Sequence, residues 1–243
     1  MTSTFERRLV FLDASVLAAP TTRSLFLFGQ LHEDADFRAC WSAEAEAEAD
    51  QALMRRAGKM GEKLGHTVKP VLVSDLRREV AWGDDVVVPP APDVAASLVD
   101  THFDDRHILA AAAAASSRVV VTVDVDDFGR ADLERLGVSA GNPDLFLAHT
   151  MTEAMYRFTL ERLSGKRTLE PKTPESIHAS LGRAHPMLAM AMRKVYPSIK
   201  PLSSVGGTPV EVFRGSRCLV CGKKLTDPES LVLGVGPECR RKR

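Results

Sequence analysis

Three aspartates stand where a folded chain could bring them together. Asp13 and Asp124 each directly follow a short apolar run rich in β-branched residues, at 8–12 and 118–123 respectively, and Asp105 opens an alanine-rich segment. Such runs predict buried strands of a parallel sheet, and the alanine-rich segment predicts a helix. Ligands bind at the carboxyl ends of parallel strands. We therefore expect both strand-end aspartates to reach one crevice and Asp105 to point at it.

A fourth acid comes from a second predicted helix. Ser42 is suited to cap it, and Glu44, Glu46 and Glu48 follow in alternation with alanine. One helical face can point inward, and Glu44 and Glu48 share it at i, i+4, so Glu48 is the candidate and Glu44 the alternative. Converging carboxylates repel one another, and Mg²⁺ or Mn²⁺ would relieve that repulsion because hard cations take oxygen ligands.

Such ions generate hydroxide and stabilise an in-line displacement at phosphorus. The competing interpretation is structural, since an aspartate at a helix start is more often a cap than a ligand, and glutamates alternating with alanine can form a solvated face.

Three cysteines near the end of the chain have the spacing of a zinc site. Cys218 and Cys221 form a CxxC turn followed by Gly222, and Cys239 returns after 17 intervening residues. Structural zinc takes four ligands, so one is missing from this set. The candidates for the fourth are Asp227, Glu238, His178, His185 and water. Cys40, far from the others in sequence, is expected to be a buried apolar residue.

Composition and charge limit the classes of protein. The chain has 243 residues, 44% of them hydrophobic, with 32 basic and 32 acidic side chains. Residues 1–150 carry a net charge of −9 and residues 151–243 one of +9. This balance excludes a uniformly basic protein, and no apolar run approaches the ~20 residues needed to cross a bilayer. Clustered cysteines with CxxC spacing favour a reducing compartment, so we expect a cytoplasmic protein.

Alternating strand and helix patterns predict an α/β fold with a parallel sheet. A third strand is expected at 86–88, after predicted helical residues 43–54, and a short helix should end at Gly137. From Asp144 to Tyr196 the pattern is helical, with breaks expected at Pro171, Pro174 and Pro186, and Leu145, Leu147, Met151 and Met155 suit one amphipathic helix. The predicted divisions are an α/β domain at 1–147, for which the resemblance described next implies a nuclease-like domain, a helical extension at 148–200, a linker at 201–212 and a separate small zinc module at 213–243.

Four motifs together resemble a known family, the PIN domain, over about residues 8–147. They are Leu12-Asp13-Ala-Ser-Val-Leu, Trp41-Ser42 leading to Glu48, Asp104-Asp105-Arg106-His107-Ile-Leu-Ala-Ala, and Val121-Thr122-Val-Asp124-Val-Asp126-Asp127-Phe. The likeness is closest to the subgroup with the Asp-Asp-Arg-His signature, which includes VapC-type toxins. Residues 218–239 resemble a small module of unknown function found on bacterial and phage proteins.

The resemblance implies a three-layer α/β/α fold and a metal-dependent ribonuclease with Mg²⁺ or Mn²⁺ at the acids and Zn²⁺ at the cysteines. The residues it assigns are Asp13, Glu48, Asp105 and Asp124 for metal and catalysis, with Asp104, Asp127 and Thr122 beside them. That subgroup often has Asn at the Asp124 position, so the charge here is higher. Thr122 could hold a metal-bound water or a substrate phosphate, and His107 could be a general acid or simply solvated.

The expected partners are RNA and, for a toxin, an antitoxin protein that masks the acids; a homodimer is left open. The basic segment 213–243, with eight basic and three acidic side chains, could contact phosphates or be a solvated tail. One alternative is a non-catalytic RNA- or protein-binding module with this fold. Another is a zinc-dependent DNA-interacting regulator driven by the basic segment.

Overall fold

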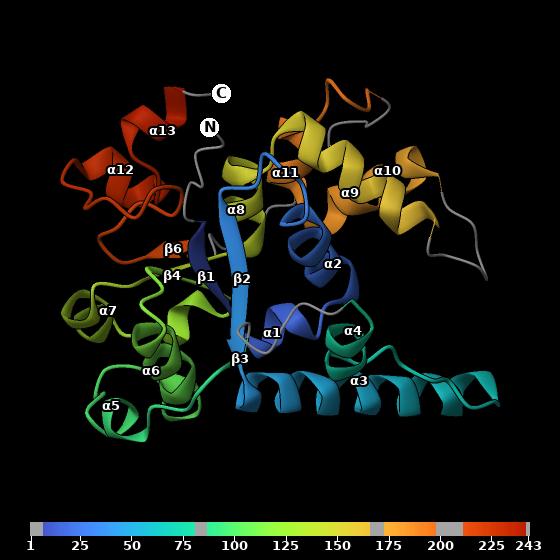
Figure 1. Cartoon of the computed structure of the whole chain (residues 1–243), viewed down its shortest axis with the longest axis horizontal. Helices are drawn as coiled ribbons and strands as arrows, with labels where there is room; N and C mark the ends of the chain where they lie inside the picture. The colour runs from blue at the N-terminus through green and yellow to red at the C-terminus, as the bar shows by residue number, and fades with distance from the viewer. Residues whose placement is uncertain (1–6, 81–86, 166–172, 198–210, 242–243) are drawn as a thin grey trace.

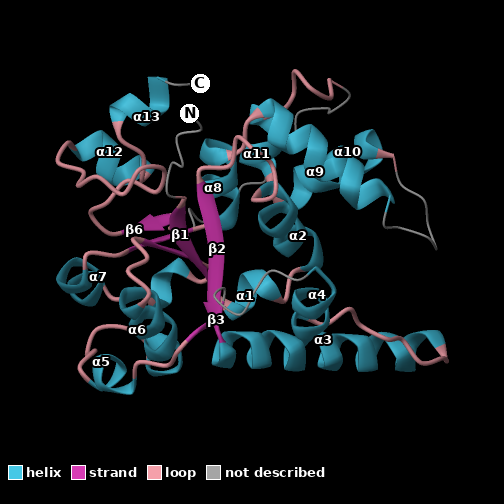
Figure 2. Ribbon diagram, in the orientation of Figure 1, coloured by secondary structure: helices cyan, strands magenta, loops and turns pink. Residues whose placement is uncertain are grey.

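A mostly parallel sheet forms the centre of the molecule, and helices cover both of its faces (Figures 1 and 2). The computed structural model describes residues 7–80, 87–165, 173–197 and 211–241. The sheet has six strands in the order β3-β2-β1-β4-β5-β6. Their bounds are β1 Arg8–Leu12, β2 Phe37–Ser42, β3 Val87–Val88, β4 Val119–Val121, β5 Ser139–Gly141 and β6 Phe213–Arg214. The predicted α/β class is thereby confirmed.

The strand order reverses between the two central strands, β1 and β4. From β1 the chain builds β2 and β3 on one side, and β4 and β5 on the other, all in parallel. In the pairing of β1 with β4, Leu12 lies opposite Val121. Such a switch point is where open α/β sheets bind ligands, at the carboxyl ends of the strands. The next residues along each strand, Asp13 and Thr122, therefore lie at the expected ligand-binding edge.

Helices in the first part of the chain flank the strands that they connect. Their bounds are α1 Ala14–Leu17, α2 Pro20–Gly29, α3 Ala43–Leu64, α4 Val73–Val80, α5 Pro92–Ala96, α6 Arg106–Ala114 and α7 Arg130–Leu136, with 3-10 turns η2 Phe103–Asp105 and η3 Val125–Asp127. Helices α5, α6 and α7 lie on one side of the sheet and α1 to α4 on the other (Figure 1). The α/β/α layering expected from the sequence is present.

Helix α3 starts as predicted but is longer. Ser42 is its N-cap, and the Ser42 hydroxyl accepts a hydrogen bond from the Ala45 amide at 3.1 Å. The helix continues ten residues past the expected end at Met54 to Leu64, because good helix formers follow and the first stop signal is Gly65, at φ 70°. Helix α7 ends where predicted, with Gly137 as a left-handed cap.

The helical extension consists of four helices in the described part of the chain. Their bounds are α8 Pro143–Thr150, α9 Glu153–Gly165, α10 Pro174–Ala184 and α11 Pro186–Ala191. The prediction of one amphipathic helix through Met151 and Met155 was wrong, because α8 ends at Thr150 and α9 begins at Glu153. Both methionines are nevertheless buried. Pro174 and Pro186 begin helices, as proline at a first turn favours. The expected break at Pro171 and the linker segment 201–209 fall outside the described residues.

The last part of the chain extends the central sheet. Strand β6 pairs antiparallel with β5, and two short helices follow, α12 Pro228–Leu233 and α13 Pro237–Arg241. Leu219 is fully buried, and the Arg8 guanidinium of β1 donates to the Leu219 carbonyl at 2.6 Å. A side chain added at Gly141 of β5 would meet Leu219 at 2.7 Å. The segment expected to be a separate unit therefore packs directly on the nuclease-like domain.

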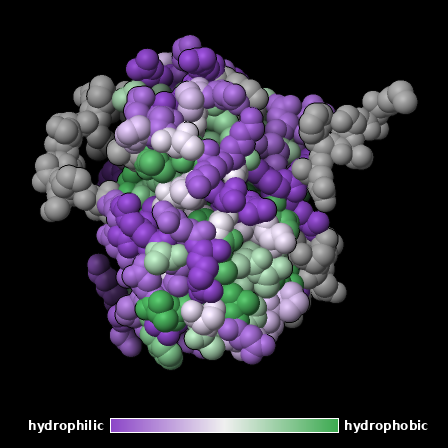
Figure 3. Space-filling model, turned by 90° about the vertical axis from the view of Figure 1, so that its left-hand side faces the viewer, coloured by the Kyte–Doolittle hydropathy of each residue, from purple (hydrophilic) through white to green (hydrophobic). Residues whose placement is uncertain are grey.

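The surface is mostly polar on the side turned to the viewer in Figure 3, and its apolar areas are separate patches among hydrophilic side chains. Among the described residues, no helix combines the length and the apolar character that crossing a bilayer would require.

Candidate functional site

Asp13 and Thr122 meet at the carboxyl ends of β1 and β4. The Thr122 hydroxyl donates to Asp13 Oδ2 at 2.7 Å, and the Ser15 hydroxyl donates to the same oxygen at 2.6 Å. Thr122 is fully buried, and its oxygen also accepts from the Asp124 amide at 3.0 Å. These contacts hold the Asp13 carboxylate in one orientation. The Thr122 hydroxyl is used in this way within the protein, whereas the sequence suggested contact with water or phosphate.

Three aspartates occupy helix-start positions, and none of them caps its helix. Asp13 precedes α1, Asp105 precedes α6 and Asp124 precedes η3, yet none of these side chains makes a capping hydrogen bond. Capping is the usual structural reason for an aspartate at such a position. That explanation therefore does not account for these three carboxylates.

The charge of Asp13 acts on three other carboxylates of the site. Burial is the largest cause raising the pKa values of Glu48, Asp105 and Asp124, and the charge of Asp13 raises each of them further. Asp127 adds to the rise at Asp105 and Asp124. We call Asp13, Glu48, Asp105, Asp124 and Asp127 the acidic cluster.

The pKa of Asp105 is raised to about 6, which is the largest numerical shift in the acidic cluster. After burial, the charges of Asp13 and Asp127 raise it, while His102 and His107 lower it. The Asp105 side chain is 21% exposed, whereas that of Asp104 is 80% exposed. Asp105 is thus the better placed of the two neighbours to share a ligand with Asp13, and Asp104 acts on Glu48 from outside.

The glutamates of α3 divide between two environments. Glu48 feels the charge of Asp13, and its Oε1 lies 3.3 Å from His107 Nε2. Glu46 is buried instead: it accepts from Trp41 Nε1 at 2.8 Å and pairs with Arg77 at 3.0 Å. Glu46 therefore anchors α3 to β2 and α4. This placement favours Glu48 as the acid that joins the cluster. Glu46, which helical spacing placed on another face, has a structural role that the sequence did not predict.

Asp132 is a carboxylate of the same domain whose role is structural, and it provides a comparison for the acidic cluster. It is buried, and its Oδ2 accepts from the backbone amides of Val99, Asp100 and Thr101 at 2.8–3.1 Å. Burial alone would raise its pKa, but these donors lower it below the usual value. Glu48, Asp105 and Asp124 show the opposite shift, because burial and the neighbouring carboxylates raise their pKa values.

The donor set of the acidic cluster fits a hard divalent cation. Within the described residues, its ion pairs are to the histidines His102 and His107. Among the described residues, the cysteine group alone brings three or more potential metal ligands within 4.8 Å of one another, so no three of these carboxylates lie that close together. Carboxylate oxygens suit Mg²⁺ or Mn²⁺, and such an ion would relieve the repulsion between them.

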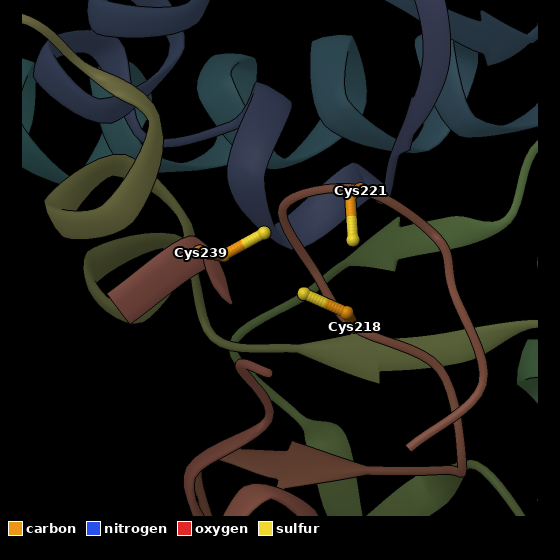
Figure 4. A group of neighbouring side chains, drawn as sticks. All are labelled: Cys218, Cys221 and Cys239. Atoms are coloured by element: carbon orange, nitrogen blue, oxygen red, sulfur yellow. The ribbon is translucent and has the colours of Figure 1, made fainter. Parts of the chain in front are cut away.

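The three cysteines do converge. Their sulfur atoms all lie within 4.8 Å of one another, and Figure 4 shows the thiols of Cys218 and Cys221 on one turn facing the thiol of Cys239 from α13. Gly222 has φ 68°, which permits the turn after Cys221, and its amide donates to the Cys218 carbonyl at 2.8 Å. Three sulfurs around one zinc ion lie about 3.8 Å apart. The group therefore needs little movement to hold one ion.

The thiols differ in their surroundings. Cys218 is fully buried; burial would raise its pKa, but amide hydrogen bonds, the first from Gly236 at 3.4 Å, lower it below the usual value. Burial raises the pKa of Cys239 to about 12, and the neighbouring thiols contribute. Thiols that share one site in this way favour a cation that neutralises them together. Cys40 is buried at 1% exposure, as predicted, and burial raises its pKa to about 12.

Two of the five candidates for a fourth zinc ligand are wrong. His178 bonds to the Tyr156 hydroxyl at 2.8 Å and His185 to the Thr22 hydroxyl at 2.8 Å, both buried in the helical extension. Asp227 and Glu238 line the same cavity as the cysteines. Asp227 is engaged as the N-cap of α12, and Glu238 pairs with Lys223 at 3.1 Å. Asp227, Glu238 and water therefore stay candidates for the fourth position.

Comparison with known proteins gives two matches. Residues 211–243 match the family described as "Family of unknown function (DUF6011)". A second match, 30% identical over 111 residues, is to a protein of Mycobacterium tuberculosis (strain ATCC 25618 / H37Rv) named "Putative ribonuclease VapC50". The alignment covers 45% of this chain and 65% of that protein, so the chain spans less than two thirds of this relative. No solved structure matches the chain.

The similarity and the fold agree with the motifs. A mostly parallel α/β sheet is consistent with a PIN-like fold, and a relative named as a ribonuclease is consistent with the motif resemblance. The match to a family of unknown function covers the cysteine segment and gives no activity for it.

The electrostatic contrast between Asp105 and Asp132 predicts opposite effects of one substitution. Asp105→Asn should raise the free energy of unfolding at pH 7 without divalent ions, by on the order of 1–3 kcal/mol, because the wild-type native state disfavours this charge. Its native pKa is raised to about 6, so wild-type stability falls as pH rises from about 4 to 6. Denaturant unfolding from pH 4 to 8 measures both effects.

Asp132→Asn is the matched control. It should lower the free energy of unfolding at pH 7 by about 1–3 kcal/mol, because a charged acceptor of three amides is lost. Destabilisation by both variants would contradict the account of the acidic cluster.

Proposed function

We propose that the protein is a metal-dependent endoribonuclease that hydrolyses phosphodiester bonds of RNA at the acidic cluster. The observation that carries this proposal is the position of Asp13 at the switch point of the sheet, where its charge adds to the burial that raises the pKa values of Asp105 and Asp124. None of these three aspartates caps the helix that it precedes. The motif resemblance to PIN ribonucleases and the similarity to a protein named as a ribonuclease support the choice of RNA.

Each side chain has a proposed role. Asp13, Asp105 and Asp124 would hold a Mg²⁺ or Mn²⁺ ion, and Glu48 would hold a second ion or orient the attacking water. When bound, such an ion supplies a nucleophile at neutral pH and stabilises charge at phosphorus. Thr122 and Ser15 are positioning residues, because their hydroxyls fix the Asp13 carboxylate. With water as nucleophile, the products carry a 5′-phosphate and a 3′-hydroxyl.

His107 has a role through Glu48. Its Nε2 lies 3.3 Å from Glu48 Oε1, and its charged form lowers the pKa of Glu48 against the effects of burial and the other acids. His107 would therefore keep Glu48 ionised and hold it toward the cluster.

We extend the proposal to a biological role as the toxin of a toxin–antitoxin pair. This finer assignment rests on the resemblance to the subgroup that includes VapC-type toxins. An antitoxin would inhibit by covering the acidic cluster, and an arginine is suited to that task because it pairs with carboxylates in bidentate geometry.

We also propose that Cys218, Cys221 and Cys239 hold a structural zinc ion, with one of the remaining candidates for the fourth ligand completing the set. A segment of about 30 residues cannot bury enough apolar area alone, so a metal contributes needed stability. Because β6 pairs with β5 and Leu219 is buried on the domain, that stability is shared with the sheet.

Replacing the central aspartate should abolish cleavage. Asp13→Asn should reduce RNA cleavage in Mn²⁺ by about 100-fold or more, since even the loss of a residue that supports a ligand costs 10–100-fold. Purified protein and a mixed RNA pool, with product ends identified, provide the measurement.

The control is Asp93→Asn, an exposed acid in α5 that is not among the charges shifting the pKa values of Glu48, Asp105 and Asp124, and this variant should cleave as wild type does. Cleavage that persists in EDTA, or that Asp13→Asn leaves intact, would refute the proposed active site. RNA binding without cleavage in any divalent ion would instead favour a non-catalytic binding module.

Zinc removal should destabilise the whole chain. We expect about one zinc per chain by elemental analysis, lost in Cys239→Ser, and a fall in melting temperature of roughly 5 °C or more after chelation. Cys40→Ala is the control that should keep its zinc. A chain that contains no zinc after purification in zinc-supplemented buffer, or that melts at the same temperature without it, would disprove this assignment.

A further inference from the structure

A cavity of about 290 Å³ lies at the end of the sheet opposite the acidic cluster, between the nuclease-like domain and the cysteine module. Its walls come from the starts of β1 and β4, the end of α6 and the turn after Cys221. The polar residues that line it are Arg7, Arg8, Ser116, Arg118 and Cys221. The strand β1 has five residues at about 3.3 Å each, so this cavity and the acidic cluster lie about 16 Å apart.

The cavity is strongly positive. Three arginines line it, and within the described part of the chain no acidic side chain does. The nearest acid in contact with them is Asp36, whose Oδ2 lies 3.6 Å from Arg8 Nε and whose side chain is 55% exposed. The Arg7 guanidinium donates to the Gln30 and His32 carbonyls at 2.7 and 3.2 Å, which leaves its charge without a paired acid among the described residues. An anion in the cavity would be stabilised by this excess of positive charge.

Arg8 has donors that the protein does not use. Its Nη1 donates to the Leu219 carbonyl at 2.6 Å, and its guanidinium lies 5.1 Å from the centre of the Phe146 ring, which fixes the group in place. Its Nη2 is buried and has no hydrogen-bond partner in the described residues. A buried donor of this kind is costly unless an acceptor reaches it. Because this nitrogen is closed to solvent, an anion in the cavity would interact with Arg8 through its charge, and a hydrogen bond to Nη2 would require the side chain to move.

Arg118 contributes an exposed side chain to the wall of the cavity. Its side chain is exposed, and no hydrogen bond or ion pair joins it to the described residues. Its stem packs on the turn after Cys221, since a side chain at Gly222 would meet Arg118 Cβ at 3.5 Å. Its Nη1 lies beside Gly137 and close to Arg217, since a side chain at Gly137 would meet both arginines at 3.3 Å. Arg118 would therefore have to turn toward an anion, but it would break no hydrogen bond or ion pair in doing so.

We propose that this cavity binds the phosphate group of a phosphorylated ligand. Phosphate offers several acceptor oxygens to several guanidinium groups at once, which a single carboxylate cannot do. The volume is close to the lower limit of small-ligand pockets and admits a phosphate with part of a nucleoside. The source of the phosphate is a free mononucleotide or the backbone of an RNA strand, and binding requires neither the acidic cluster nor cleavage.

The site joins the two parts of the chain. Cys221 lines this cavity and also the cavity of the cysteine group, so one turn contributes to both sites. Bound phosphate would therefore bridge β1 and β4 to the cysteine module. The arginines of this site all belong to the first part of the chain, and the cysteine module contributes the turn at Cys221 and Gly222.

The test is a binding titration on the zinc-loaded full chain without Mg²⁺ or Mn²⁺, using inorganic phosphate, adenosine 5′-monophosphate and a short RNA with no terminal phosphate. Wild type should bind at least one probe saturably, and Arg118→Gln should weaken that binding by about 10-fold, the effect of one charge-assisted hydrogen bond. Arg55→Gln removes the same charge from an exposed position of α3 and should change it less than 2-fold.

The pattern among probes identifies the source. Binding of phosphate or the mononucleotide with loss in Arg118→Gln indicates a free ligand, and RNA binding alone with the same loss indicates the backbone. No saturable binding of any probe, or binding that Arg118→Gln and Arg55→Gln affect equally, would overturn the proposal. Circular dichroism and melting of each variant check that it folds. A failure here leaves metal-dependent cleavage untouched, and an inactive acidic cluster leaves this titration unchanged.

Discussion

The pairing of β1 with β4 is the constraint on which the rest of the site depends. Their register sets Leu12 opposite Val121, so Asp13 and Thr122, the next residues, share a 2.7 Å hydrogen bond at the switch point of the sheet. That bond, together with the hydrogen bond that the Asp124 amide donates to the Thr122 hydroxyl, fixes the position of the Asp13 carboxylate. The other acids come from helix starts around this point, and the fold accepts their mutual repulsion. Sites that must bind a ligand commonly carry such a local cost in stability.

Two other carboxylates show that this domain can satisfy an acid when structure alone requires it. Asp132 has three backbone donors, and Glu46 has Trp41 and Arg77. The acidic cluster lacks such partners among the described residues beyond the histidines and the hydroxyl groups on Asp13. The same logic applies with opposite sign at the other end of the sheet, where Arg8 has an unused buried donor. Unsatisfied charge at both ends of the sheet is what distinguishes the two proposed sites from the structural polar groups.

Much of the fold and of the acidic cluster could be predicted from residue types, and the predictions that failed did so for physical reasons. The strands at Arg8–Leu12 and Val119–Val121 could be predicted because both lie in short apolar runs that an aspartate follows, the second of them rich in valine. Phe37–Ser42 has no β-branched residue and Ser139–Gly141 has only small ones, so tertiary pairing decides both strands. Phe213–Arg214 is a strand solely through β5, which is why the last segment looked independent. Helical spacing placed Glu46 on a different face from Glu44 and Glu48. Its burial against Trp41 and Arg77 is a tertiary contact, which spacing alone could not predict.

The central claim is that the acidic cluster binds a divalent ion through Asp13. Calorimetric titration of Mn²⁺ into zinc-loaded protein at pH 7, without RNA, tests it most directly. The account predicts saturable binding of at least one Mn²⁺ by wild type, with a rise in melting temperature, and loss of both in Asp13→Asn. Absence of saturable Mn²⁺ binding in wild type, or equal binding by the variant, would contradict it.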